Sequence, residues 1–270
     1  MSDDTSPRLY VFDLDGVLYR GSEPVDHAAA SLVRLRAQGS HIRLFFLTNN
    51  SSQTRRTYID KLTAFGMPCG EDEIVTSASA TAAYLAGRYP DIAGRTALVV
   101  GGQGIIEELT RIGLHVRGPR EPTGEGHIDF VVAGLDREFD YATLTRAQKA
   151  ILGGAEFVAT NRDGQFPLEG GRVIPGGGSI VAAIEAATDV TPTVVGKPEP
   201  LGLQTILALA GCTAGEAVMV GDRMDTDILC ANRIGVPSVL VLTGVTTASA
   251  ARAAVGLMQP GRVINDLREL

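Results

Sequence analysis

The sequence YVFDLDGVLY, Tyr10–Tyr19, decides how this chain folds. It overlaps a short apolar run, Arg8–Phe12, of the kind that forms a fully buried strand. The run is followed by Asp13, Asp15 and Gly16, and side chains two residues apart on a strand point to the same side, so both carboxylates can face one cleft. In an open parallel sheet, ligands bind at the carboxyl ends of the strands, where this pair would lie. The alternative is a strand that simply ends in turn-forming Asp and Gly residues, and the rest of the chain decides between the two.

The composition is that of an ordinary globular protein, with 44% apolar and 20% charged residues among 270. A formal net charge of −7, without any Lys/Arg run, argues against nucleic acid or an anionic membrane as a partner. No apolar run approaches the roughly 20 residues that a membrane-spanning helix needs. The amino terminus is polar and acidic, unlike a signal peptide, and the scattered Cys69, Cys212 and Cys230 suit reduced thiols. We therefore expect a cytoplasmic protein.

Strands and helices alternate along the chain, which predicts an α/β fold with a mainly parallel sheet. The pattern restarts near Pro90–Gly94, and a turn-rich segment, Thr160–Gly178, precedes the return to strongly polar strand ends. We predict a Rossmann-like parallel-sheet core from residues 1–81 and 179–270, with an inserted α/β cap domain over residues 82–178. Asp225–Arg233 is predicted as a helix, and Ser238–Leu242 as the last clear strand.

Four separate apolar runs end in polar residues, namely Asp13 with Asp15, Thr48-Asn49-Asn50, Lys197, and Asp222 with Asp227. If the strands are parallel, all four endings converge on one edge of the sheet. Carboxylates without nearby His or Cys suit a hard ion such as Mg²⁺, whereas ammonium, hydroxyl and amide groups suit phosphate oxygens. An aspartate can also act as a nucleophile that becomes an aspartyl-phosphate. Phosphoryl transfer at a Mg²⁺ site fits every member of this set.

The same residues carry a family resemblance. The chain resembles the haloacid dehalogenase superfamily, in particular its phosphatases with a large inserted cap. The branch includes p-nitrophenyl, phosphoglycolate, glycerol-3-phosphate and pyridoxal phosphatases. The matching motifs are FDLDGVL at 12–18, LTNNS at 47–51, VVGKPEP at 194–200 and VGDRMDTDI at 220–228, and residues 159–179 resemble the cap loop of the branch. The resemblance spans nearly the whole chain.

The resemblance implies a role for each matched residue. Asp13 would be the nucleophile and a Mg²⁺ ligand. Asp15 would be the general acid and then the general base, with its backbone carbonyl touching the metal. Asp222 would be the third protein ligand of the metal, and Asp227 would support it through water.

The phosphate-binding residues implied by the resemblance are Thr48 and the amides of Asn49 and Asn50. Lys197 would neutralise charge on Asp13 and on the phosphoryl oxygens.

Simpler explanations exist for several of these residues. Acidic residues such as Asp225 and Asp227 are favoured by the macrodipole at the start of a helix, and the polar run 48–51 suits a helix cap. Lys197 would be a surface lysine if the strand end were solvated. The glycines of Gly101–Gly104 are interpreted as a tight turn in the insert, because Glu107 occupies the position where a dinucleotide fingerprint needs a small residue.

We expect a Mg²⁺-dependent phosphomonoesterase that acts on a small phosphorylated metabolite. One alternative is a catalytically idle sensor that binds such a metabolite. Another is a haloacid dehalogenase, which needs neither a metal nor an acid for the leaving group and would leave Asp15 and Asp222 without a purpose. The sequence is compatible with a homodimer but does not specify one.

Selection of the leaving group is assigned to the turn-rich Asn161–Leu168 in the insert, where loops vary independently of the core. Phe166 in this loop either faces the substrate or packs beneath the loop. In pyridoxal phosphatases a histidine stands at the matching position, which argues against pyridoxal phosphate as the substrate.

Overall fold

The structure is a computed structural model that describes residues 7–121, 126–167 and 172–270. The chain forms two compact units. The first unit comprises residues 1–48, 56–75 and 197–270, and the second comprises residues 49–55 and 76–196. The boundaries expected from the sequence, near residues 82 and 178, therefore lie inside the second unit, which also takes in the short loop 49–55.

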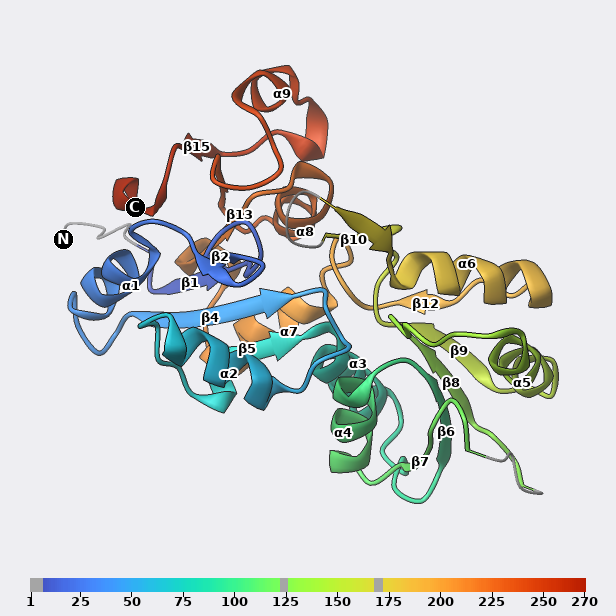
Figure 1. Ribbon diagram of the computed structural model, residues 1–270. Coiled ribbons are helices and arrows are strands. Elements are labelled where there is room, and N and C mark those ends of the chain that lie inside the picture. Colours follow the sequence, from blue (N-terminus) through green and yellow to red (C-terminus); the bar gives the residue numbers. More distant parts are fainter. Residues whose placement is uncertain (1–6, 122–125, 168–171) are drawn as a thin grey trace. The chain divides into compact units, whose positions relative to one another are not determined.

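The first unit is built on a six-stranded sheet with the order β15-β14-β13-β1-β4-β5 (Figure 1). These strands are β1 (Leu9–Phe12), β4 (Arg43–Thr48), β5 (Ile74–Thr76), β13 (Ala217–Gly221), β14 (Ser238–Val241) and β15 (Arg262–Ile264). β1 runs parallel to both of its neighbours, with Phe12 opposite Val220 and Phe46. Every residue of β1 and β13 is buried, as expected for central strands covered on both faces.

The helices of the first unit are α1 (Ala28–Arg36), α2 (Arg55–Ala64), α7 (Leu201–Ala210), α8 (Leu229–Arg233) and α9 (Ala248–Ala253). A small hairpin, β2 (Tyr19–Arg20) with β3 (Glu23–Pro24), follows β1.

The second unit contains a five-stranded sheet with the order β12-β9-β8-β6-β7. Its strands are β6 (Thr96–Val100), β7 (His115–Arg117), β8 (Phe130–Ala133), β9 (Glu156–Ala159) and β12 (Thr193–Val194), and every pairing is parallel. Its helices are α3 (Ser77–Arg88), α4 (Gln103–Arg111), α5 (Tyr141–Leu152) and α6 (Gly177–Thr188). A short antiparallel hairpin joins β10 (Gln165–Pro167) to β11 (Val173–Pro175).

The predicted α/β fold with parallel sheets is confirmed, and the structure adds elements that the sequence did not indicate. The turn-rich segment 160–178 contains the β10–β11 hairpin, and β15 adds a strand after the last predicted one. The predicted helix 225–233 begins as a π-helical turn, Met224–Ile228, and becomes α-helical only at Leu229.

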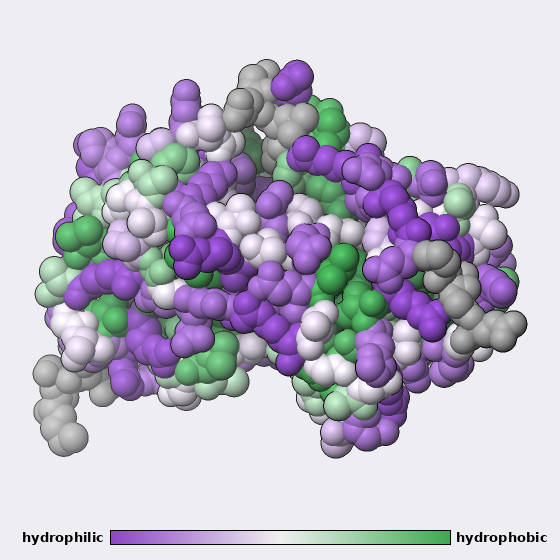
Figure 2. All heavy atoms as spheres, turned by 60° about the horizontal axis from the view of Figure 1, so that its bottom comes forward, coloured by the Kyte–Doolittle hydropathy of each residue, from purple (hydrophilic) through white to green (hydrophobic). Residues whose placement is uncertain are grey.

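On the face shown in Figure 2, hydrophobic residues form small patches that hydrophilic residues separate. Within the described residues, no helix combines the length and apolar character needed to cross a membrane.

Candidate active site

Asp13 lies immediately beyond β1 at the carboxyl edge of the first unit's sheet. Its backbone N–H donates to the carbonyl of Val220, 2.9 Å away, so the parallel pairing with β13 continues up to this residue. The chain then turns at Gly16, whose φ of +83° lies in the left-handed region. A Cβ atom on Gly16 would lie 2.5 Å from Oδ2 of Asp222. Glycine is therefore needed at this position for two reasons: it adopts the left-handed turn, and it lets the loop after β1 approach Asp222 closely.

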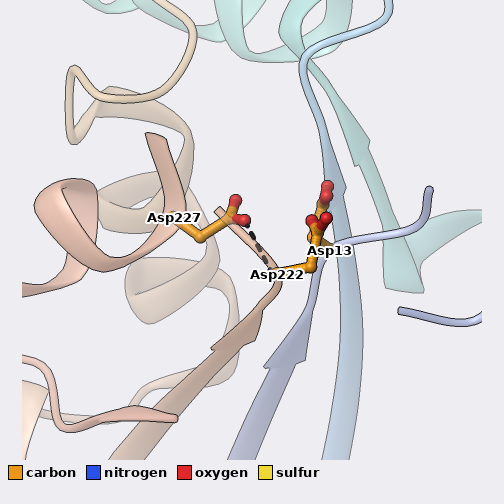
Figure 3. A group of neighbouring side chains, drawn as sticks. All are labelled: Asp13, Asp222 and Asp227. Atoms are coloured by element: carbon orange, nitrogen blue, oxygen red, sulfur yellow. Dashed lines mark hydrogen bonds between the residues drawn. The ribbon is translucent and has the colours of Figure 1, made fainter. Parts of the chain in front are cut away.

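Two more carboxylates reach the same edge from the β13 side. Asp222 follows β13 directly, and Asp227 lies in the π-helical turn; they are 1% and 0% exposed. Oxygens of Asp13, Asp222 and Asp227 all lie within 4.8 Å of one another (Figure 3). Oδ2 of Asp227 accepts hydrogen bonds from the N–H groups of Asp222 (3.2 Å) and Arg223 (3.1 Å), which ties the turn to the end of β13.

Lys197 supplies the positive charge of this cluster. Its Nζ lies 2.6 Å from Oδ1 of Asp13 and 2.7 Å from Oδ1 of Asp227, and it also donates to the carbonyl of Leu47 at 3.2 Å. The residue is only 4% exposed, so the surface-lysine explanation is wrong. Burial alone would lower the pKa of Lys197, but the carboxylates of Asp13 and Asp227 together raise it above the usual lysine value. The ammonium is therefore charged throughout the neutral range.

The donor set of this cluster fits a hard divalent cation. Three carboxylates face one ammonium, which leaves two negative charges in excess when all four groups are ionised. Burial, with Asp227 nearby, raises the pKa of both Asp13 and Asp222 above the usual range. Oδ1 of Asp222 is buried and has no hydrogen-bond partner among the described residues. An all-oxygen site with an unpaired buried acceptor and excess negative charge suits Mg²⁺.

Asp15 differs from the other three aspartates because its side chain is exposed. The surrounding atoms still desolvate its carboxyl enough to raise the pKa, and Lys61 and Arg20 offset part of this shift. The Nζ of Lys61 lies 3.6 Å from the centroid of the Tyr19 ring, which places the lysine beside this loop. A carboxyl with a raised pKa at an accessible position is suited to exchange protons. The sequence motifs gave no indication of Lys61, which lies within a helix.

The polar run after β4 divides between the two units. Thr48 ends β4 and is buried, whereas Asn49 and Asn50 belong to the second unit. Oδ1 of Asn50 accepts hydrogen bonds from the backbone N–H and the hydroxyl of Ser52, at 2.9 and 2.7 Å. These bonds form a local turn ahead of α2, which begins only at Arg55, so they do not cap the helix as the simpler explanation expected. The side chain of Asn49 instead donates to Asp163, far along the chain.

Phe166 lies in β10 of the second unit and is half-buried. The guanidinium carbon of Arg137 is 5.5 Å from the centroid of its ring, within the range of a cation–π contact. Leu168, the last residue of the predicted selectivity loop, lies outside the described residues.

Comparison with known proteins places the chain in a family. A model of the haloacid dehalogenase-like hydrolases matches residues 10–115, and a second, HAD-hydrolase-like model matches residues 194–270. The acid sugar phosphatase of Staphylococcus epidermidis is 37% identical over 240 residues, which are 89% of this chain and 88% of the relative. The chain belongs to the haloacid dehalogenase-like hydrolases. The family predicted from the four motifs is therefore confirmed.

Solved structures of this family closely resemble the fold. The glycerol phosphate phosphatase of Mycobacterium tuberculosis, solved in complex with magnesium, is 36% identical with a TM-score of 0.86, covering 97% of this chain and 76% of that one. The p-nitrophenyl phosphatase of Archaeoglobus fulgidus is 33% identical with a TM-score of 0.85, covering 97% of both chains. The predicted branch and enzyme class are confirmed: the chain is a phosphatase.

Proposed function

We propose that this phosphatase hydrolyses phosphomonoesters of small polyols, such as sugar phosphates and glycerol phosphate, with Mg²⁺ and through an aspartyl-phosphate on Asp13. The observation that carries the proposal is the buried cluster of Asp13, Asp222, Asp227 and Lys197 at the carboxyl edge of the sheet. The polyol class is suggested by the relatives, which are acid sugar phosphatases and a glycerol phosphate phosphatase.

Asp13 is the proposed nucleophile. A carboxylate oxygen of Asp13 bonds to phosphorus while the ester P–O bond breaks, and the leaving oxygen departs with the electron pair of that bond. In the second step a water oxygen bonds to phosphorus, the acyl-phosphate bond breaks, and the Asp13 carboxylate is restored. The Lys197 ammonium, 2.6 Å from Oδ1 of Asp13, orients the carboxylate and balances the charge of the phosphoryl oxygens.

Asp13, Asp222 and the backbone carbonyl of Asp15 are the groups proposed to hold Mg²⁺, with Asp227 supporting the metal through water. When bound, Mg²⁺ would offset the negative charge of the carboxylates and of the phosphate. Asp227 also holds Lys197 in place at 2.7 Å.

Asp15 is the proposed general acid and base. In its protonated form it gives a proton to the leaving oxygen, and its carboxylate then takes a proton from the attacking water. Its exposed position and raised pKa support this role.

Substrate contacts are assigned to Thr48, Asn49, Asn50 and Lys197 for the phosphoryl group, and to Phe166 for the leaving group. In this assignment the first unit is the phosphatase core and the second is the cap that selects substrates. A cytoplasmic location agrees with the three free cysteines, and a homodimer remains a prediction.

Phosphate release from a panel of phosphorylated metabolites tests the function. With Mg²⁺, we expect sugar phosphates and glycerol phosphate to give higher kcat/KM values than phosphomonoesters without a polyol, and chelation to stop release. Treatment with hydroxylamine during turnover should trap a hydroxamate at Asp13. A preference for other leaving groups would contradict the polyol assignment, and absence of release from every phosphomonoester would contradict the proposal as a whole.

Asp227 and Asp225 provide a matched pair of variants. Asp227 is buried against Lys197, whereas Asp225 is exposed and paired with Arg223 at 2.8 Å. Asp227→Asn should weaken Mg²⁺ activation about tenfold or more, because changes to the groups that support metal ligands typically cost about 10–100-fold. Asp225→Asn should leave it unchanged. Equal effects would show that both residues merely favour the start of the helix.

A further inference from the structure

The backbone carbonyl of Asn49 is held by two side chains from distant parts of the second unit. Ser77, at the start of α3, donates its hydroxyl to this carbonyl over a distance of 2.5 Å. Asn161, which follows β9, donates its Nδ2 to the same carbonyl over a distance of 2.7 Å. Ser77 is 1% and Asn161 4% exposed. In a planar trans peptide, the C=O of one residue points opposite to the N–H of the next. Two buried donors on this carbonyl therefore fix the direction of the Asn50 N–H, which is a proposed phosphate donor.

The side chain of Asn49 is fixed as well. Its Nδ2 donates to Oδ2 of Asp163 at 3.1 Å. Its Oδ1 lies against Gly196, where an added Cβ would come within 2.8 Å of this oxygen and 2.4 Å of the Thr160 carbonyl. Glycine is therefore needed at residue 196 for the carboxamide to take this position, which leaves Asn49 little freedom to rotate.

Asp163 is itself held firmly by its neighbours. Its backbone N–H donates to Oδ1 of Asn161 at 3.0 Å, and its carbonyl accepts from the N–H of Gly178 at 2.9 Å. Asn161 thus connects both halves of the arrangement, because it supports Asp163 with its oxygen and the Asn49 carbonyl with its nitrogen.

The remainder of the loop is anchored to α4 of the same unit. Arg55 forms a two-point ion pair with Glu108, with nitrogen–oxygen distances of 2.6 and 3.0 Å, and Glu108 is only 4% exposed. The N–H of Gly104 donates to the carbonyl of Ser52 at 3.3 Å. The whole loop 49–55 is therefore positioned by the second unit.

We infer that Asn161 and Asp163 are positioning residues for the phosphoryl group: they set the Asn49 carboxamide and the Asn49–Asn50 peptide in the orientation that binds phosphate oxygens. The inference rests on the proposed function, in which these amides bind the phosphoryl group. It assigns to Asp163 a task different from leaving-group selection. Because phosphate is common to every phosphomonoester, loss of Asp163 lowers turnover of all substrates by the same factor.

Binding of inorganic phosphate, measured by calorimetry with Mg²⁺, provides the primary test, because it does not depend on turnover. Asp163→Ala should weaken phosphate binding about tenfold, the range of one hydrogen bond to a charged group. Asp163→Asn keeps an oxygen that accepts the Asn49 N–H and should stay within about threefold of wild type. Arg162→Ala is the matched control, because the neighbouring Arg162 is exposed and pairs with Glu185 instead. It should bind phosphate as the wild type does.

A double-mutant cycle with Asn49→Ala separates positioning from a direct or purely structural role. If Asp163 acts through Asn49, adding Asp163→Ala to Asn49→Ala should cause little further loss. Full additivity, or an unchanged phosphate affinity in Asp163→Ala, would overturn the inference.

Turnover with two substrates of different leaving groups completes the test. The loss of kcat/KM in Asp163→Ala should be equal for both, and a loss confined to one of them would instead make Asp163 a selectivity residue. A wild-type protein that binds phosphate without hydrolysing any ester would refute the proposed function. In that case, the phosphate affinities of the variants would still decide the inference. A wild-type protein that binds no phosphate would refute the inference itself.

Discussion

Replacement of Lys197 by methionine removes the only ammonium seen in the carboxylate cluster within the described residues. Methionine nearly matches lysine in length, so the change is mainly one of charge. Lysine is 4% exposed here and bonds Asp13, Asp227 and a carbonyl at 2.6–3.2 Å. Removing one partner of a buried ion pair costs about 3–5 kcal/mol. For a protein of this size, that corresponds to a decrease in Tm of about 6–20 °C.

The loss should depend on pH in a defined direction. Burial raises the pKa of Asp13 to about 8 and that of Asp222 to about 7, from 3.8 for an unperturbed aspartate. An acid whose pKa is raised by folding opposes folding once it ionises, so stability falls as pH rises from about 4 to about 8. Lys197 has a raised pKa and stays charged across this window. The difference in Tm between wild type and Lys197→Met should therefore increase from pH 5 to pH 8.

Thermal unfolding at pH 5, 6.5 and 8, with and without Mg²⁺, measures this effect. Mg²⁺ should recover part of the lost Tm at pH 8, because it supplies positive charge to the same oxygens and binds only the folded chain. Lys149→Met, at an exposed position on α5, is the control and should melt as the wild type does. A Lys197→Met protein that melts within about 2 °C of wild type at every pH would refute the reasoning, because the loss of one buried ion-pair partner predicts more than about 3 kcal/mol.

Three further predictions concern catalysis. Asp13→Asn should reduce kcat to below about 1% of wild type, because the reaction slows tenfold for each 1.36 kcal/mol by which its barrier rises. Activity above that level would remove Asp13 from the nucleophile role. Asp222→Ala should be partly rescued by excess Mg²⁺, whereas Asp15→Asn should lower kcat by about 10²–10⁴-fold at saturating Mg²⁺, since it loses proton transfer. A common response of both variants in a Mg²⁺ titration would contradict this division. Phe166→Ala should lower kcat/KM for bulky organic phosphates by about 1–3 kcal/mol and leave acetyl phosphate and Tm nearly unchanged. Equal losses for both substrates with a lower Tm would assign Phe166 to packing against Arg137.

The sheet edge was predictable from the sequence because the physics of parallel strands is simple. Apolar runs such as Leu9–Phe12 and Ala217–Val220 are buried on both faces and form adjacent strands. The carboxyl ends of parallel strands meet at one edge, so the residues that follow them had to lie near one another. The structure accordingly brings Asp13 and Asp222 within a few ångströms of each other. Lys197 also contacts Asp13, but the shared edge does not explain this contact, because the strand before Lys197, β12, pairs with β9 in the sheet of the second unit.

The contacts of the second unit were not predictable in the same way. Asn161 and Asp163 lie in a polar loop without periodicity, and they contact Asn49 from more than 100 positions away along the chain. Loop residues of this kind leave no pattern in hydrophobicity, and their partners depend on tertiary structure. The β10–β11 hairpin escaped prediction for the same reason, because its strands are three residues each and lie among turn-forming residues.

Asp227 shows why the simple explanation of a helix-favouring acid was incomplete. The N–H groups of Asp227 and Ile228 both donate to the Arg223 carbonyl, which produces the wide π-helical turn. This turn lets the carboxylate fold back on the end of β13, where a Cβ on Gly221 would lie 2.2 Å from the Cβ of Asp227. One oxygen then accepts the backbone N–H groups at the start of the turn, as a capping acid does, and the other accepts from Lys197. Capping and pairing with Lys197 are therefore two consequences of one geometry, and π-helical turns of this type are frequent at functional sites.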